Sequence, residues 1–164
     1  MGRLGAALAA ALTFACAAPA FGMTDGGVGL SLDWPANGTV TRGFGYDPTM
    51  GEFHTGIDIG SLLSLDVRAA GPGVVEATGY ATGFEGYGNI VLVDMGSGIE
   101  ALYAHLASVR VAVGDVVFPG ELLGQAGCTG WCTGTHLHFE LRSHGSAFDP
   151  WPLLPATIPG PEGG

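Results

Sequence analysis

The chain has 164 residues, of which 47% are apolar, and this is enough for one domain with a hydrophobic core but not for a second full domain. It carries 5 basic and 15 acidic side chains, a net charge of −10, and it has no lysine. A basic surface for nucleic acid or for an anionic membrane is therefore not expected. Thirty glycines and ten prolines argue against long helices and favour short strands joined by tight turns.

The N-terminus has the pattern of a secretory signal peptide. Arg3 is followed by an alanine-rich apolar run, and Ala18-Pro19-Ala20 is an acceptable cleavage site. The run is shorter than the ~20 residues that a transmembrane helix needs. Cys16 suggests a lipoprotein as an alternative, but the residues before it lack the leucine of such a signal. We predict a signal peptide over residues 1–20, export to the periplasm or the extracellular cell wall, and no stable membrane insertion after cleavage.

Residues 21–38 show little periodicity and are expected to form a short N-terminal segment. Six later stretches are rich in valine, isoleucine or aromatic residues and are mostly bounded by glycine, which predicts strands. These stretches are 39–46, 73–80, 88–95, 98–106, 114–127 and 136–142, and the fifth contains two short strands around Pro119-Gly120. Residues 153–164 are rich in proline and glycine and predict a surface tail. The fold class expected is mainly β, with antiparallel sheets in a sandwich-like domain and short helical turns only.

Two histidines lie two residues apart in the last predicted strand, within the sequence "GTHLHFEL". Side chains alternate between the two faces of a strand, so His136 and His138 are expected on one side, while Leu137 and Phe139 pack on the other. Two imidazoles that face one point suit a metal ion, a polarised substrate oxygen, or both. Such a pair also occurs in ordinary cores and surfaces, so the rest of the chain has to decide.

Two other stretches place histidine beside glycine or at a strand end. His54 and Asp58 are four residues apart in "FHTGIDI", where the glycine permits a bend and a loop could fold both side chains onto one ion. His105 ends the predicted strand 98–106. Zinc accepts a mixed set of imidazole nitrogen and carboxylate oxygen, and its catalytic sites have three protein ligands and one open position. Each stretch is common by chance, but together they predict a site.

Cys128 and Cys132 flank the residues "TGW" directly before the histidine pair. In an oxidising compartment two cysteines in one glycine-rich loop can reach disulfide distance, and we favour this over free thiols or thiolates on a metal. So small a loop gains roughly 2 kcal/mol or less from closure. The expected effect of the disulfide is to hold the loop still beside His136.

At these residues the chain resembles the lysostaphin/LytM-type zinc metallopeptidases, secreted enzymes that cut peptide bonds in bacterial peptidoglycan. The likeness runs from about Val40 to Pro150 and lies in "FHTGIDI", "GYGNIVLVDMG", "YAHL" and "TGTHLHFEL". It implies a LytM-type domain over residues 39–152, with antiparallel sheets around a groove that holds the metal site. Its implied ligands for one Zn²⁺ per chain are His54, Asp58 and His138, and its implied catalytic pair is His105 and His136.

The sequence thus predicts a secreted, monomeric zinc metalloendopeptidase with peptidoglycan as its substrate. One alternative is a non-catalytic, wall-binding regulator of another cell-wall hydrolase. Regulators in this family typically lack some of the five residues, and here all five are present. A second alternative is a zinc peptidase that acts on a protein. The cysteine pair departs from the family pattern without touching a ligand, and His144 is expected in an exposed turn outside the site.

Overall fold

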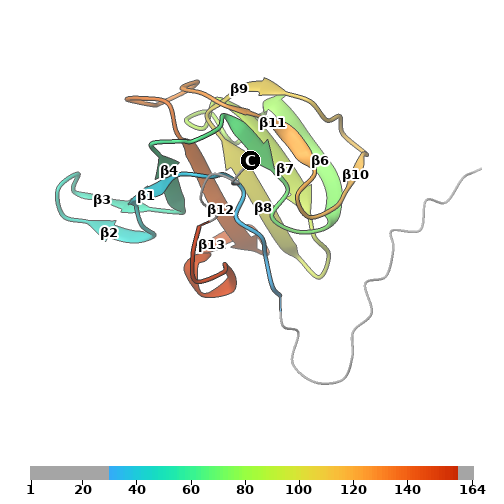
Figure 1. Cartoon of the computed structure of the whole chain (residues 1–164), viewed down its shortest axis with the longest axis horizontal. Helices are drawn as coiled ribbons and strands as arrows, with labels where there is room; N and C mark the ends of the chain where they lie inside the picture. Colours follow the sequence, from blue (N-terminus) through green and yellow to red (C-terminus); the bar gives the residue numbers. More distant parts are fainter. Residues whose placement is uncertain (1–29, 159–164) are drawn as a thin grey trace, which may run out of the picture.

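The computed structural model describes residues 30–158 (Figure 1). The predicted signal peptide, Cys16 and the last six residues of the predicted tail lie outside this range. Within it the chain forms thirteen strands and one short 3-10 helix, and every strand pair is antiparallel. The prediction of a mainly β fold with short helical turns only is confirmed for these residues. No helix between residues 30 and 158 is long and apolar enough to cross a membrane.

The large sheet forms the body of the molecule and remains open at both edges (Figure 1). Its order is β1-β4-β12-β8-β7-β6-β10, and β13 also pairs with β12. In chain order these strands are β1 (Thr39–Arg42), β4 (Ile57–Gly60), β6 (Gly73–Tyr80), β7 (Asn89–Asp94), β8 (Ile99–Ala104), β10 (Val116–Val117), β12 (Leu137–Ser143) and β13 (Ser146–Phe148).

Two smaller sheets and the 3-10 helix complete the fold. One sheet has the order β5-β11-β9, and the other is the β2-β3 hairpin, which extends away from the large sheet in Figure 1. These elements are β2 (Gly45–Asp47), β3 (Glu52–His54), β5 (Asp66–Arg68), β9 (Leu106–Val109), β11 (Leu122–Ala126) and η1 (Trp151–Leu153).

All six predicted strand stretches contain strands, and β6 has the predicted bounds. The region around His54 differs from the expectation. The bend at Gly56 is present, but it joins two strands, β3 and β4, where a loop was expected. These strands have three and four residues, too few for their alternation to be read from the sequence.

Alternation along β12 separates the main core from the outer face of the sheet. Leu137, Phe139 and Leu141 are fully buried in the main core, which also includes side chains of β5, β9 and β11. The large sheet and the β5-β11-β9 sheet therefore enclose one hydrophobic layer, as in a sandwich. His138 and Glu140 lie on the opposite face of β12, because successive side chains of a strand point to opposite sides.

Candidate functional site

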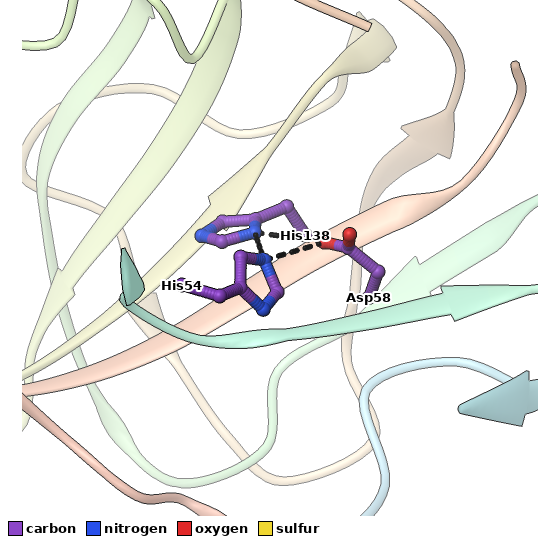
Figure 2. A group of neighbouring side chains, drawn as sticks. All are labelled: His54, Asp58 and His138. Carbon is purple, nitrogen blue, oxygen red and sulfur yellow. Dashed lines mark hydrogen bonds and ion pairs between the residues drawn. The ribbon is translucent and has the colours of Figure 1, made fainter. Parts of the chain in front are cut away.

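Three side chains, His54, Asp58 and His138, meet at one point (Figure 2). His54 Nε2 lies 3.1 Å from His138 Nδ1 and 3.2 Å from Asp58 Oδ1. His138 Nδ1 lies 2.9 Å from the same Asp58 oxygen. The register of the large sheet explains part of this arrangement, since Asp58 of β4 is paired with His138 of β12. Directly paired residues share a face of the sheet. We call these three residues the His–Asp–His cluster.

The geometry of the His–Asp–His cluster fits a tetrahedral metal ion. Zinc binds histidine nitrogen and carboxylate oxygen at about 2.0–2.1 Å, so two tetrahedral ligands are about 3.3 Å apart. The three distances between the ligand atoms are 2.9, 3.1 and 3.2 Å. The ligand atoms therefore already have nearly the spacing that such an ion requires.

Both histidines of the cluster also have the tautomer that a metal ligand needs. His54 Nδ1 donates to the carbonyl oxygen of Gly43 at 2.8 Å, which leaves Nε2 with a free lone pair. His138 Nε2 lies 3.0 Å from Oε1 of Glu140, and a carboxylate can only accept, so the proton belongs on Nε2 and the inner Nδ1 keeps a free lone pair. The outer nitrogens thus orient the inner ones toward Asp58.

The charge of the cluster favours a cation. Burial alone would raise the pKa of the Asp58 carboxyl, but the adjacent imidazoles of His138 and His54 outweigh it, and the net pKa lies well below the usual range. Burial would likewise raise the pKa of Glu140, and hydrogen bonds from His138, Thr55 and Tyr87 reverse that effect. Two ionised carboxylates therefore flank His138, and a positive ion between the ligand atoms would offset their charge.

His105 and His136, which we call the histidine pair, lie directly beside the cluster. Their ring centroids are 4.8 Å apart, and the His105 ring is 5.8 Å from that of His138. His136 Nε2 lies 3.7 Å from Asp58 Oδ1. The structure therefore brings together all five residues that the sequence analysis selected, and it places His136 and His138 on the same side of the sheet, as predicted.

The histidine pair is oriented by backbone carbonyls of one loop. His105 Nδ1 donates to the carbonyl of Thr129 at 2.8 Å and His136 Nδ1 donates to the carbonyl of Gly134 at 2.7 Å, so the Nε2 of each ring remains available for proton transfer. His105 has a positive φ of 61° at the point where β8 ends and β9 begins. This left-handed backbone conformation is unfavourable for residues other than glycine. Burial lowers the pKa of His105, so its neutral, basic form prevails at pH 7.

The loop that supplies these carbonyls is cross-linked and tightly packed. Cys128 and Cys132 lie at disulfide distance, with Cα atoms 5.3 Å apart, which confirms the predicted pairing. Gly130 has φ 72°, and a Cβ there would come within 2.5 Å of the backbone nitrogen of Gly88. The loop therefore packs backbone against backbone on the turn before β7, and only glycine fits at this contact.

The sequence analysis missed a polar group behind His138 that consists of Thr55, Tyr87 and Glu140. Tyr87 donates to Glu140 Oε1 at 2.6 Å, and Thr55 donates to the same oxygen. Burial, with the hydrogen bond to Glu140, raises the pKa of Tyr87 to about 12. A signal for Glu140 was present, because the alternation that pairs His136 with His138 also places residue 140 on their side of the strand.

His144 lies in the exposed turn between β12 and β13, at the other end of β12 from the site. Its backbone N–H donates to the carbonyl of Gly98 at 2.7 Å, and its Nδ1 lies 3.2 Å from the hydroxyl of Ser143. The prediction that this histidine lies outside the site is confirmed.

Comparison with known proteins identifies the family. Residues 52–150 match Peptidase family M23, and the chain belongs to that family. It is 40% identical over 109 residues to the DD-carboxypeptidase/endopeptidase Mpg of Neisseria meningitidis serogroup B, a match that covers 66% of this chain and 24% of that protein. It is 32% identical over 142 residues to lysostaphin of Staphylococcus simulans, covering 82% of this chain and 28% of lysostaphin. The chain spans about a quarter of the length of these relatives.

Solved structures of similar fold agree with this assignment. Lysostaphin of Staphylococcus simulans superposes with a TM-score of 0.65 at 30% identity, covering 82% of this chain and 60% of that chain. A zinc containing peptidase from Vibrio cholerae superposes with a TM-score of 0.62 at 28% identity, covering 79% of this chain and 40% of that chain. The resemblance noted in the sequence and the mainly β, antiparallel fold are both confirmed.

Proposed function

We propose that this chain is an exported zinc metalloendopeptidase that hydrolyses peptide bonds in bacterial peptidoglycan. The observation that supports this most is the convergence of three ligand atoms of the His–Asp–His cluster, no more than 3.2 Å apart, beside two further histidines. Membership of a peptidase family and relatives named lysostaphin and endopeptidase support the same reaction class.

In this proposal His54, Asp58 and His138 hold one Zn²⁺ per chain. Zinc at such a site supplies Lewis acidity, which polarises a scissile carbonyl and lowers the pKa of a water molecule. The chain's own contribution is to present three correctly oriented ligand atoms with the histidine pair directly beside them.

The histidine pair performs the proton transfers. One imidazole accepts the proton of the attacking water through its free Nε2 and returns it to the leaving amine, because imidazole titrates near neutral pH. The other donates a hydrogen bond to the oxyanion that develops on the scissile carbonyl. The lowered pKa of His105 suits the role of base, and His136, which lies beside Asp58, is then the partner of the oxyanion.

Export and a wall substrate are supported by two features outside the site. The N-terminal sequence has the pattern of a signal peptide over residues 1–20, and the pairing of Cys128 with Cys132 suits an oxidising compartment. We propose a monomer in the periplasm or at the cell wall. Intact-mass analysis from the native host should find a chain that begins near residues 21 to 23, and recovery of Met1 on extracytoplasmic protein would refute cleavage.

The test of the function is digestion of purified peptidoglycan by the mature protein, with the released fragments identified by mass spectrometry. We expect cleavage in the presence of zinc and none after chelation. The fragment masses decide whether the bond is a D-alanine to diaminopimelate crosslink, a glycine-rich bridge or a stem-peptide bond. Zinc binding without release of fragments would support the regulator, and cleavage of a protein but not of wall would support the protein peptidase.

A further inference from the structure

Glu140 of β12 is a charged side chain with no exposed surface. It is paired across the sheet with Leu102 of β8, in the small apolar cluster on the outer face of the large sheet. A buried carboxylate is unfavourable unless it is hydrogen-bonded or paired with a positive charge. The chain therefore has a specific reason to keep an acid at this position.

The hydrogen bonds of Glu140 are distributed unequally between its two oxygens. Oε1 accepts from the Tyr87 hydroxyl at 2.6 Å, from His138 Nε2 at 3.0 Å and from the Thr55 hydroxyl. Among the described residues Oε2 accepts no hydrogen bond, and the nearest cation is Arg142, with Nη1 at 3.6 Å. Three donors thus fix the one oxygen that faces His138.

The partners of Glu140 also connect the two halves of the site. Thr55 follows the candidate ligand His54 directly in the chain. The ring of Tyr87 lies 5.5 Å from the ring of His138, and its carbonyl accepts the backbone N–H of His105 at 2.9 Å. The carboxylate is therefore at the centre of a network that reaches both the His–Asp–His cluster and the histidine pair.

We infer that Glu140 is a positioning residue that holds the His138 ring in the orientation and tautomer in which Nδ1 is the metal ligand. A carboxylate accepts but does not donate, so it selects the form of His138 with its proton on Nε2. Without it, a proton on Nδ1 would block the lone pair that faces Asp58 and His54. A partner on the outer nitrogen of a ligating histidine typically contributes 10–100-fold to metal affinity.

This inference rests on the proposed zinc site, and the test separates the two. The zinc dissociation constants of wild type and Glu140→Gln are measured by competition with a chromophoric chelator, after circular dichroism has confirmed that both are folded. We expect binding of the variant to be weaker by about 10–100-fold. Glu100→Gln is the matched control, because Glu100 lies on β8 near the same Arg142 (Nε to Oε2 3.9 Å) and has no hydrogen bond to His138. It should bind zinc like wild type.

A second variant decides the question if Glu140→Gln does not fold. Tyr87→Phe removes one of the three donors to Oε1 and keeps the ring beside His138. Its zinc binding should weaken several-fold, and its cobalt(II) complex should show an altered visible spectrum, because the geometry around the metal is less fixed. Unchanged zinc affinity in every folded variant would overturn the role of Glu140 and leave the zinc site standing. A wild type that binds no zinc would overturn both.

Discussion

The two halves of the site are built in different ways. The His–Asp–His cluster comes from β3, β4 and β12, and two of its members face each other through the register of the large sheet. The histidine pair lies at strand ends. Its rings are held by the carbonyls of Thr129 and Gly134, in the loop between β11 and β12 that contains the Cys128–Cys132 pair. Metal binding should therefore depend on the sheet, and proton transfer on the loop. Variants that affect one half and spare the other can test this division.

The largest effect is expected from Asp58→Ala. It removes an ion-pairing carboxylate that both ligand histidines contact, so the variant should lose its zinc and with it all measurable peptidoglycan hydrolysis. His138→Ala should behave in the same way. Metal analysis of the purified proteins measures this directly, and a variant that keeps one zinc per chain would remove that residue from the ligand set.

His105→Ala should separate catalysis from metal binding. It leaves the three ligand atoms of the cluster untouched, so zinc content should stay close to one per chain. The rate of peptidoglycan hydrolysis should fall by ~10²–10⁴, the usual contribution of a general acid or base or of an oxyanion partner. We expect the same of His136→Ala. Loss of zinc from His105→Ala would mean that the division between the two halves is wrong.

Reduction of the disulfide between Cys128 and Cys132 should have a smaller effect, and only on the histidine pair. The carbonyls of Thr129 and Gly134 remain, but the loop that presents them loses its cross-link, so hydrolysis should fall by less than in His105→Ala, while zinc stays bound. The loss in free energy of unfolding should be roughly 2 kcal/mol or less. The double variant Cys128→Ser/Cys132→Ser controls for side effects of the reductant. Two free thiols in oxidised protein from the host would contradict the pairing.

We expect no effect on metal binding or on proton transfer from His144→Ala. This side chain is exposed in the β12–β13 turn and makes no contact with the other four histidines in the described structure. Zinc content and hydrolysis should both match wild type within error. A change in either quantity would show that the site extends along β12 beyond Glu140.

The difference between local strand patterns and long-range packing explains what could be predicted from the sequence. Alternation within a strand is a local property, so the common face of His136 and His138 and the bounds of β6 followed from the pattern of residues alone. The pairing of Asp58 with His138 joins segments 80 residues apart and depends on tertiary packing. The loop carbonyls were not predictable, because backbone groups have no residue-type signal. Glu140 could have been predicted, since it continues the alternation that selected the histidines.

The most direct measurement is the anomalous diffraction signal at the zinc edge from crystals of the zinc-loaded protein. The account predicts one peak at the His–Asp–His cluster, bonded at about 2.0–2.1 Å to His54 Nε2, Asp58 Oδ1 and His138 Nδ1, with the histidine pair beside it but not bonded to it. A peak bonded to His105 or His136, a bond through His138 Nε2, or no peak at this position would contradict it.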